Sequence, residues 1–253
     1  AGCASAMGWP AAMRRLRSSE ELYSGRLAVK VYECGHSADR GAGAVMREVM
    51  WEVHVLRQLG SHPHVVRLCD AIEFTDAVYI VMERYEGPCL LEHIRTRPGG
   101  VLPDAEAAAL FCHVLAALVH AHSRGFLHGD LKPANVRLSA ACDRAVVVDW
   151  ASAVSTRVRQ SGEISQGTPS YASPERLTGY NPEQVWACKG QLRLCAASDV
   201  WSLGVCLYEM VHGVLPFGGE TFAQLTDNVR HLRFGTAGRV EAGGGADGST
   251  ART

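Results

Sequence analysis

Residues 128–135, which read HGDLKPAN, constrain this chain more than any other segment. An apolar run further on predicts a buried strand that leads directly into Asp149. The polar side chains of Asp130, Asn135 and Asp149 are therefore expected in apolar surroundings, and their oxygens are of the hard type that suits Mg²⁺. Lys132 beside them could neutralise a phosphoryl group during its transfer. These are the residue types that phosphoryl transfer requires.

The first 90 residues predict a sheet with one helix. Leu27–Tyr32 is apolar and rich in β-branched residues, which predicts a strand that carries Lys30. Apolar residues then recur at helical spacing between Val45 and Leu59, which places Glu48 and Glu52 one turn apart on an adjoining face. Either glutamate could meet Lys30.

The remaining elements follow from the same patterns. Asp104 is the predicted N-cap of an Ala- and Leu-rich helix that runs to about Arg124 and closes at Gly125. One further helix is predicted over Thr221–Leu232. The other predicted strands are Val65–Leu68, Ala77–Met82 and Val146–Val148.

The composition is that of one soluble globular domain. The 253 residues include 25 Lys+Arg against 26 Asp+Glu, so the chain has no excess positive charge and composition favours neither a nucleic-acid nor a membrane partner. The longest apolar stretch, Ala107–Ala121, is shorter than the roughly 18 residues of a bilayer span, so no transmembrane helix is expected. Nine cysteines without close pairing suit a reducing compartment. The expected location is the cytoplasm, or else the nucleus.

In their order along the chain, these features resemble a eukaryotic protein kinase domain of the serine/threonine type. The resemblance runs from about Gly25 to Phe217 and includes Gly167-Thr168-Pro169, Ser173-Pro174-Glu175 and the segment Ser198–Gly204. It implies an α+β, two-lobed fold, with a small β-rich lobe that has one helix and a larger, mostly helical lobe. The implied divisions are an N-terminal extension without a Gly-rich loop (1–24), a partial small lobe (25–85), a partial large lobe (86–234) and a disordered Gly/Ala-rich tail (235–253).

The resemblance implies an ATP site in the small lobe. Lys30 would hold the α- and β-phosphates, with Glu52 as its ion-pair partner in preference to Glu48. Met82 would be the gatekeeper, and the Glu83 carbonyl and the Tyr85 backbone would bind the adenine edge. The implied cofactor site consists of Ala28, Lys30, Glu52, Met82, Glu83, Tyr85 and Asp149.

The catalytic roles are likewise implied by the resemblance. Asp130 would accept the proton of the substrate hydroxyl, and Lys132 would contact the γ-phosphate. Asn135 and Asp149 would hold Mg²⁺, while His128 would serve as a structural, packed residue. Lys132 after Asp130, together with Thr168, indicates Ser or Thr substrates.

The chain departs from the family pattern at several positions. Residues 1–24 contain no G-x-G-x-x-G, so the first two strands of the small lobe are expected to be missing and ATP binding to be weakened. Gly129 stands where many kinases have Arg, so no cation is expected beside Asp130 to pair with an activation-loop phosphate, and regulation by that switch is not expected. Arg137 occupies a position where an apolar residue usually faces the adenine, which would cost desolvation or close the pocket. About a dozen extra residues around Asn181–Cys195 indicate an inserted loop.

Three functions remain open at this point. The first is ATP-dependent phosphoryl transfer to Ser or Thr of a protein substrate, and the second is a pseudokinase that acts as a binding or scaffolding module. The third is a small-molecule phosphotransferase, because 128–130 and 149–150 also resemble aminoglycoside-type kinases, although Lys132-Pro133 argues against it. Phosphorylation of Ser161 or Ser165 is expected to have little effect because Gly129 replaces the Arg. The oligomeric state is left open.

Overall fold

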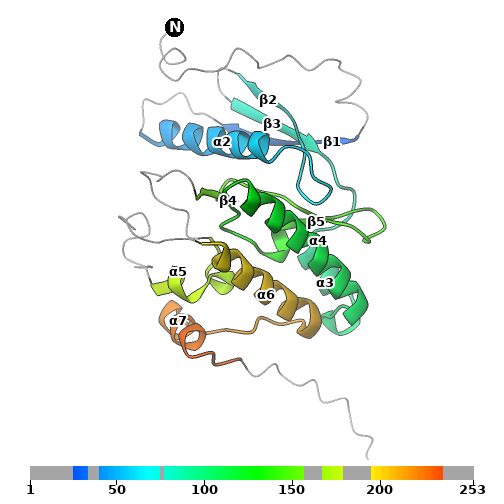
Figure 1. Ribbon diagram of the computed structural model, residues 1–253, viewed down its shortest axis with the longest axis vertical. Helices are drawn as coiled ribbons and strands as arrows, with labels where there is room; N and C mark the ends of the chain where they lie inside the picture. Colours follow the sequence, from blue (N-terminus) through cyan, green and yellow to red (C-terminus); the bar gives the residue numbers. More distant parts are fainter. Residues whose placement is uncertain (1–24, 34–39, 75–76, 157–166, 179–194, 236–253) are drawn as a thin grey trace, which may run out of the picture.

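The computed structural model describes residues 25–33, 40–74, 77–156, 167–178 and 195–235. In Figure 1 three strands and helix α2 form a small region at one end, and the other helices form the larger region below it. The chain therefore has the predicted two-lobed α+β fold. The predicted extension (1–24), Ser161, Ser165, nearly all of the inserted loop and nearly all of the tail lie outside the described residues.

The small lobe is an antiparallel sheet of order β1-β3-β2, made of β1 (Leu27–Glu33), β2 (Leu68–Glu73) and β3 (Ala77–Glu83). Strands β1 and β3 begin where the sequence predicts and continue one residue further than predicted. Lys30 pairs with Ile80 in the centre of this register. Helix α2 (Arg40–Leu59) supplies the buried side chains Val49, Val53 and Leu56, so its apolar face matches the predicted spacing.

The strand predicted at Val65–Leu68 is wrong in its position. Strand β2 begins only at Leu68, while Val65 and Val66 are buried near Val147 of the large lobe. The amide of Val66 donates to the Val147 carbonyl at 3.0 Å. Val65 forms an isolated bridge with Val147, so the hydrogen-bond partner of this segment comes from the other lobe, which local composition does not specify.

The large lobe contains two short antiparallel two-stranded sheets, β4-β7 and β5-β6, and most of the helices. Its elements are α3 (Leu90–Thr96), η1 (Pro98–Gly100), α4 (Asp104–Ser123), β4 (Phe126–Leu127), η2 (Pro133–Asn135), β5 (Val136–Leu138), β6 (Ala145–Val147), β7 (Val154–Ser155), η3 (Pro169–Tyr171), α5 (Pro174–Thr178), α6 (Ala196–His212) and α7 (Phe222–Arg230). Strand β6 lies one residue earlier than predicted. The helix predicted over Thr221–Leu232 is α7, with Thr221 as its N-cap.

Helix α4 corrects two predictions. Its N-cap is Pro103, not Asp104, because Asp104 is already the first helical residue. Asp104 instead places a negative charge in the first turn, where the helix dipole favours it. The second correction concerns length. By length and composition α4 is long enough to cross a membrane, whereas the expectation from the sequence rested only on the shorter apolar stretch Ala107–Ala121. Buried helices of folded domains meet the same criterion, and Leu110, Val114 and Leu118 of α4 lie in the core.

A ladder of four histidine rings joins the connection after α2 to helix α4. The ring centroids of His62 and His120 are 4.2 Å apart, and those of His64 and His113 are 4.3 Å apart. Burial lowers the pKa of His62 and His113, and the charges of His120 and Arg124 on His62 and of His64 on His113 act in the same direction. The carboxylate of Asp143 opposes this effect on the pKa of His113, whereas Arg144 reinforces it.

This ladder predicts acid sensitivity of the fold. Because the pKa of His62 and His113 is lower in the folded chain, the unfolded chain binds more protons, and the free energy of unfolding should fall as pH drops below about 6.5. Urea titrations at several pH values between 5 and 8 would measure this free energy. The double variant His62→Gln/His113→Gln should weaken its dependence on pH, whereas His54→Gln on the exposed face of α2 should leave that dependence unchanged. An unchanged slope in the double variant would contradict the assignment.

Candidate active site

A buried aspartate of α6 holds the loop at 128–135. Asp199 is 2% exposed, and its carboxylate accepts hydrogen bonds from the amides of His128 at 2.8 Å and Gly129 at 3.1 Å. His122 Nε2 lies 2.7 Å from the same carboxylate. Burial raises the pKa of Asp199, but these hydrogen bonds outweigh burial, and the net pKa lies below its ordinary value. The loop backbone is therefore fixed by an ionised, fully partnered carboxylate.

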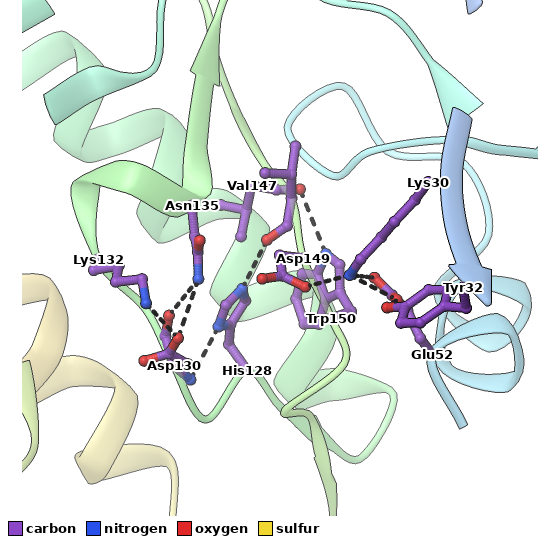
Figure 2. Close-up of polar contacts among 11 residues, drawn as sticks. Lys30, Tyr32, Glu52, His128, Asp130, Lys132, Asn135, Val147, Asp149 and Trp150 are labelled. Carbon is purple, nitrogen blue, oxygen red and sulfur yellow. Dashed lines mark hydrogen bonds and ion pairs between the residues drawn. The ribbon is translucent and has the colours of Figure 1, made fainter. Parts of the chain in front are cut away.

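His128 has the predicted structural environment. It is fully buried, and its ring lies 4.7 Å from the ring of Trp150. Its Nδ1 accepts from the Asp130 amide at 3.2 Å, so Nε2 carries the hydrogen and donates to the Val148 carbonyl at 3.1 Å. The histidine thus ties the loop to the segment that leads into Asp149 (Figure 2).

Asp130, Lys132 and Asn135 gather into one group (Figure 2). Lys132 Nζ donates to Asp130 Oδ2 at 2.8 Å and to Thr168 Oγ1 at 2.6 Å. Asn135 Nδ2 donates to the Asp130 carbonyl at 2.9 Å, and the Thr168 amide donates to Asp130 Oδ1 at 2.6 Å. Both carboxylate oxygens of Asp130 are therefore oriented, one by the loop's own lysine and one by a segment nearly 40 residues further along.

Lys30, Glu52 and Asp149 form a second group, across His128 from the first in Figure 2. Lys30 Nζ lies 3.0 Å from Glu52 Oε2 and 2.8 Å from Asp149 Oδ1. The partner of Lys30 is thus Glu52, whereas Glu48 is exposed. Burial would lower the pKa of Lys30, but the Glu52 charge and the hydrogen bond to Asp149 raise it above its ordinary value.

Asp149 has a backbone φ of 60°, in the left-handed region that few residues other than Gly adopt. Such conformations cluster at functional sites, where the surrounding structure maintains them. Burial alone would raise the pKa of Asp149, but the hydrogen bond from Lys30 and the charge of Lys30 lower it by more. The net pKa is therefore below its ordinary value, and the carboxylate is ionised at neutral pH. Asn135 lies close by, since its carbonyl accepts from the Val148 amide at 2.9 Å.

Tyr32 belongs to the second group and was missed by the sequence reasoning. Its hydroxyl donates to Glu52 Oε2 at 2.8 Å, and Lys30 Nζ lies 5.1 Å from the centre of its ring. Burial raises the pKa of the Tyr32 hydroxyl, so it stays protonated and remains a donor. The alternation of side chains in a strand, which puts residues two apart on one face, was the available signal.

Replacement of Tyr32 by Phe is expected to lower the free energy of unfolding by about 1.5 kcal/mol, because Glu52 is buried and loses a donor to a charged acceptor. Urea denaturation would measure the change. Tyr79→Phe in β3 removes a hydroxyl from the same sheet and serves as the control, with little expected effect. Equal stability of Tyr32→Phe and the wild-type chain would contradict a contribution from this hydrogen bond.

The residues proposed to contact adenine lie where β3 leaves the sheet. Ala28 of β1 pairs with Met82 of β3, and Glu83 is the last residue of β3, with Tyr85 two residues beyond it. The Glu83 amide donates to the Arg67 carbonyl at 3.0 Å, which fixes the start of this connection. These four residues thus lie on the paired strands β1 and β3 or just beyond the end of β3, and their contact with adenine stays a prediction.

Two arginines bear on the expectations for the site. The guanidinium of Arg137 donates to the Gly87 carbonyl at 2.8 Å, and the side chain is 37% exposed, so its desolvation is only partial. Its effect on the adenine pocket stays a prediction. The expectation that no cation beside Asp130 pairs with an activation-loop phosphate stays a prediction, but the backbone of Gly129 does have a cationic neighbour, because Arg176 of α5 donates from its Nη1 to the Gly129 carbonyl. Nothing in the local sequence around Gly129 indicates this contact, since the two residues are 47 positions apart.

The chain is similar in sequence to known protein kinases. The protein kinase domain model matches residues 17–238, a wider range than the predicted Gly25 to Phe217. Sperm motility kinase 2B of Mus musculus is 32% identical over 183 residues, which are 72% of this chain and 34% of that protein. CBL-interacting protein kinase 20 of Oryza sativa subsp. japonica is 33% identical over 230 residues, which are 87% of this chain and 46% of that protein.

The SNF1-related protein kinase catalytic subunit alpha KIN12 of Arabidopsis thaliana is 31% identical over 188 residues, which are 72% of this chain and 34% of that protein. The chain thus spans between about a third and a half of the length of these curated relatives. The family model nevertheless covers most of the chain. The chain belongs to the protein kinase domain family.

Proposed function

We propose that this chain transfers the γ-phosphoryl group of ATP to Ser or Thr hydroxyls of a protein substrate. The observation that carries the proposal is the position of Lys132 Nζ between the Asp130 carboxylate and the Thr168 hydroxyl. This arrangement supports roles for Asp130 as the base and Lys132 as the cation, with Thr168 beside them. Catalysis in this family is mostly positioning and electrostatic stabilisation, which such a preorganised group supplies.

In the proposed reaction the substrate hydroxyl oxygen forms a bond to the γ-phosphorus while the bond from that phosphorus to the bridging oxygen breaks and ADP leaves. Asp130 accepts the hydroxyl proton, and Lys132 stabilises negative charge on the transferred group. Asn135 keeps Asp130 in place through its bond to the Asp130 carbonyl. Lys30, held by Glu52, binds the α- and β-phosphates.

The donor set is compatible with Mg²⁺. Among the described residues no three His, Cys, Asp or Glu side chains gather into a group that could hold a metal ion. Mg²⁺ in phosphoryl-transfer sites needs fewer protein ligands, because it keeps several waters and binds substrate phosphates with one or two carboxylates. Asp149 supplies an ionised carboxylate and Asn135 an amide, and Mg²⁺ bound there would neutralise phosphate charge.

Thermal unfolding with and without MgATP tests nucleotide binding first. Binding at a hundred times the dissociation constant should stabilise the chain by about 2.7 kcal/mol. Asp149→Asn removes the negative charge of a proposed Mg²⁺ ligand. Lys30→Arg keeps a cation beside the buried Glu52 but changes the shape of the cationic group. Both variants should therefore reduce the thermal shift caused by MgATP. Transfer of labelled phosphate to casein, and none to sugars or amino alcohols, would then distinguish a protein kinase from a small-molecule phosphotransferase.

A pseudokinase is the second candidate function. The feature that favours it is the lack of G-x-G-x-x-G in the 29 residues before Lys30. No shift with MgATP from a folded chain would support this reading and exclude the proposed transfer by this form. A shift that depends on Mg²⁺, followed by phosphate transfer, would exclude it.

A further inference from the structure

Gly129 has no room for a side chain. Its φ is +78°, and a Cβ at this position would collide with the carbonyl oxygen of Ser152. The loop at 128–135, called the catalytic loop from here on, therefore cannot carry a cationic side chain at position 129 without moving the backbone around Ser152. A positive charge against the Gly129 backbone therefore has to come from elsewhere in the fold.

Arg176 supplies that charge from helix α5. The residue is only 7% exposed, and its Nη1 donates to the Gly129 carbonyl. Asp199, Asp130 and Glu175 lie close enough for their charges to act on the guanidinium. A buried arginine requires such partners, because an unpaired buried charge is strongly unfavourable.

The same guanidinium packs against the backbone that orients Asp130. A Cβ on Gly167, which has a φ of +65°, would lie 3.1 Å from both Nη atoms of Arg176 and 2.8 Å from the Gly129 carbonyl oxygen. The next residue, Thr168, donates its amide to Asp130 Oδ1 at 2.6 Å. Arg176 thus lies against the residue before Asp130 and the residue before Thr168, whose amide binds the Asp130 carboxylate.

We propose that Arg176 is a positioning residue that anchors the segment at Gly167–Thr168 to the catalytic loop and so aims the Asp130 carboxylate. The part of this inference that concerns phosphoryl transfer rests on the proposed function. Because the anchor is a buried side chain of the chain itself, the segment needs no added phosphate to reach this position. Phosphatase treatment of the active chain should therefore leave kcat within about twofold of its starting value.

The test compares Arg176→Met and Arg176→Lys with Arg57→Met, which removes an exposed arginine in the last turn of α2. Arg176→Met removes the charge at similar length, and Arg176→Lys keeps the charge but loses the planar fork of donors. The first measurement is hydrogen exchange of peptides that contain Thr168, on the nucleotide-free chain. The second is steady-state kinetics with separate kcat and KM for MgATP.

We expect the Thr168 amide to exchange at least tenfold faster in Arg176→Met and to remain protected in Arg57→Met. In an active chain kcat should fall about tenfold to a hundredfold in Arg176→Met while KM for MgATP changes less than about threefold, because a small displacement of a catalytic group affects chemistry rather than nucleotide binding. For Arg176→Lys, the exchange rate at Thr168 and kcat should lie between those of the wild-type chain and those of Arg176→Met. A further variant, Arg176→Ala, leaves space for a small cation, and millimolar guanidinium should restore part of its kcat.

The outcomes separate this inference from the proposed function. Unchanged exchange at Thr168 in Arg176→Met, or a phosphatase-treated chain with greatly reduced kcat, would overturn the anchor. A second outcome would also overturn the anchor. In it, exchange is faster throughout the chain, kcat falls while KM for MgATP rises, and guanidinium gives no rescue, so that Arg176 has only a general role in stability. An inactive wild-type chain in which Thr168 is protected by Arg176 would support the anchor and reject the proposed function.

Discussion

Replacement of Asp130 by Asn is expected to lower kcat for phosphoryl transfer by about 10²- to 10⁴-fold, the range over which general base catalysis contributes. Asn has nearly the same shape, and its carbonyl oxygen can still accept from the Thr168 amide. It cannot take the proton of the substrate hydroxyl, and it loses its ion pair with Lys132. The stabilisation by MgATP should remain, since Asp130 is not among the residues proposed to hold nucleotide.

Steady-state kinetics and thermal shift on one preparation would check this prediction. Asp143→Asn, which changes an exposed aspartate in the β5–β6 turn, is the control for loss of one charge and should keep full activity. A variant Asp130→Asn with more than about a tenth of the wild-type kcat would show that another group accepts the proton. Loss of the MgATP shift together with kcat would indicate a structural role for Asp130.

Replacement of Asp199 by Ala is expected to reduce the free energy of unfolding by about 3–5 kcal/mol, the range for removal of one member of a buried charged network. The carboxylate is the shared acceptor for the amides of His128 and Gly129 and a partner of His122. Without it these donors are buried and unpaired. The loop that carries Asp130 should also become mobile, so kcat should fall with stability.

The pH dependence gives an independent check on Asp199. Its pKa is lower in the folded chain than in the unfolded chain, so its contribution is complete above the unfolded pKa, about 3.9, and is lost as pH falls through the folded pKa. The difference in stability between wild type and Asp199→Asn should thus shrink below about pH 4. Asp104→Asn on the exposed first turn of α4 is the control, with a change of less than about 0.5 kcal/mol. A constant difference down to pH 2 would contradict the assignment.

Several elements could be predicted because their evidence is local. The strand of Lys30 and the helix of Glu52 each show their own periodicity, and the structure places both within a few residues of the prediction. Errors occurred where a partner distant in the sequence decides the outcome. The sequence predicted a strand at Val65 and Val66, but these residues lie beside Val147. The strand that joins the sheet begins only at Leu68.

In the candidate site, too, the residues with local evidence could be predicted and the contacts between distant residues could not. The loop at 128–135 contains Asp130, Lys132 and Asn135, and Asp149 follows a predicted strand. The types and spacing of these residues alone indicated phosphoryl transfer. The choice of Glu52 over Glu48 agrees with burial, since the face of α2 that meets the sheet carries Glu52 and leaves Glu48 exposed. The contact of Tyr32 with Glu52 required the side-chain positions, although the strand alternation pointed toward it.

The sequence by itself determined the family, the two-lobed class and the residues that carry charge into the site, because these depend on residue type and on spacing within a few turns or strands. Only the tertiary structure decided which charges meet. The Arg176 guanidinium reaches Gly129 over 47 positions, and the Asp199 carboxylate reaches the same loop over about 70. Such contacts form because a buried charged group must find partners, and which partners are within reach is set by the packing of α5 and α6 against the loop rather than by any local pattern.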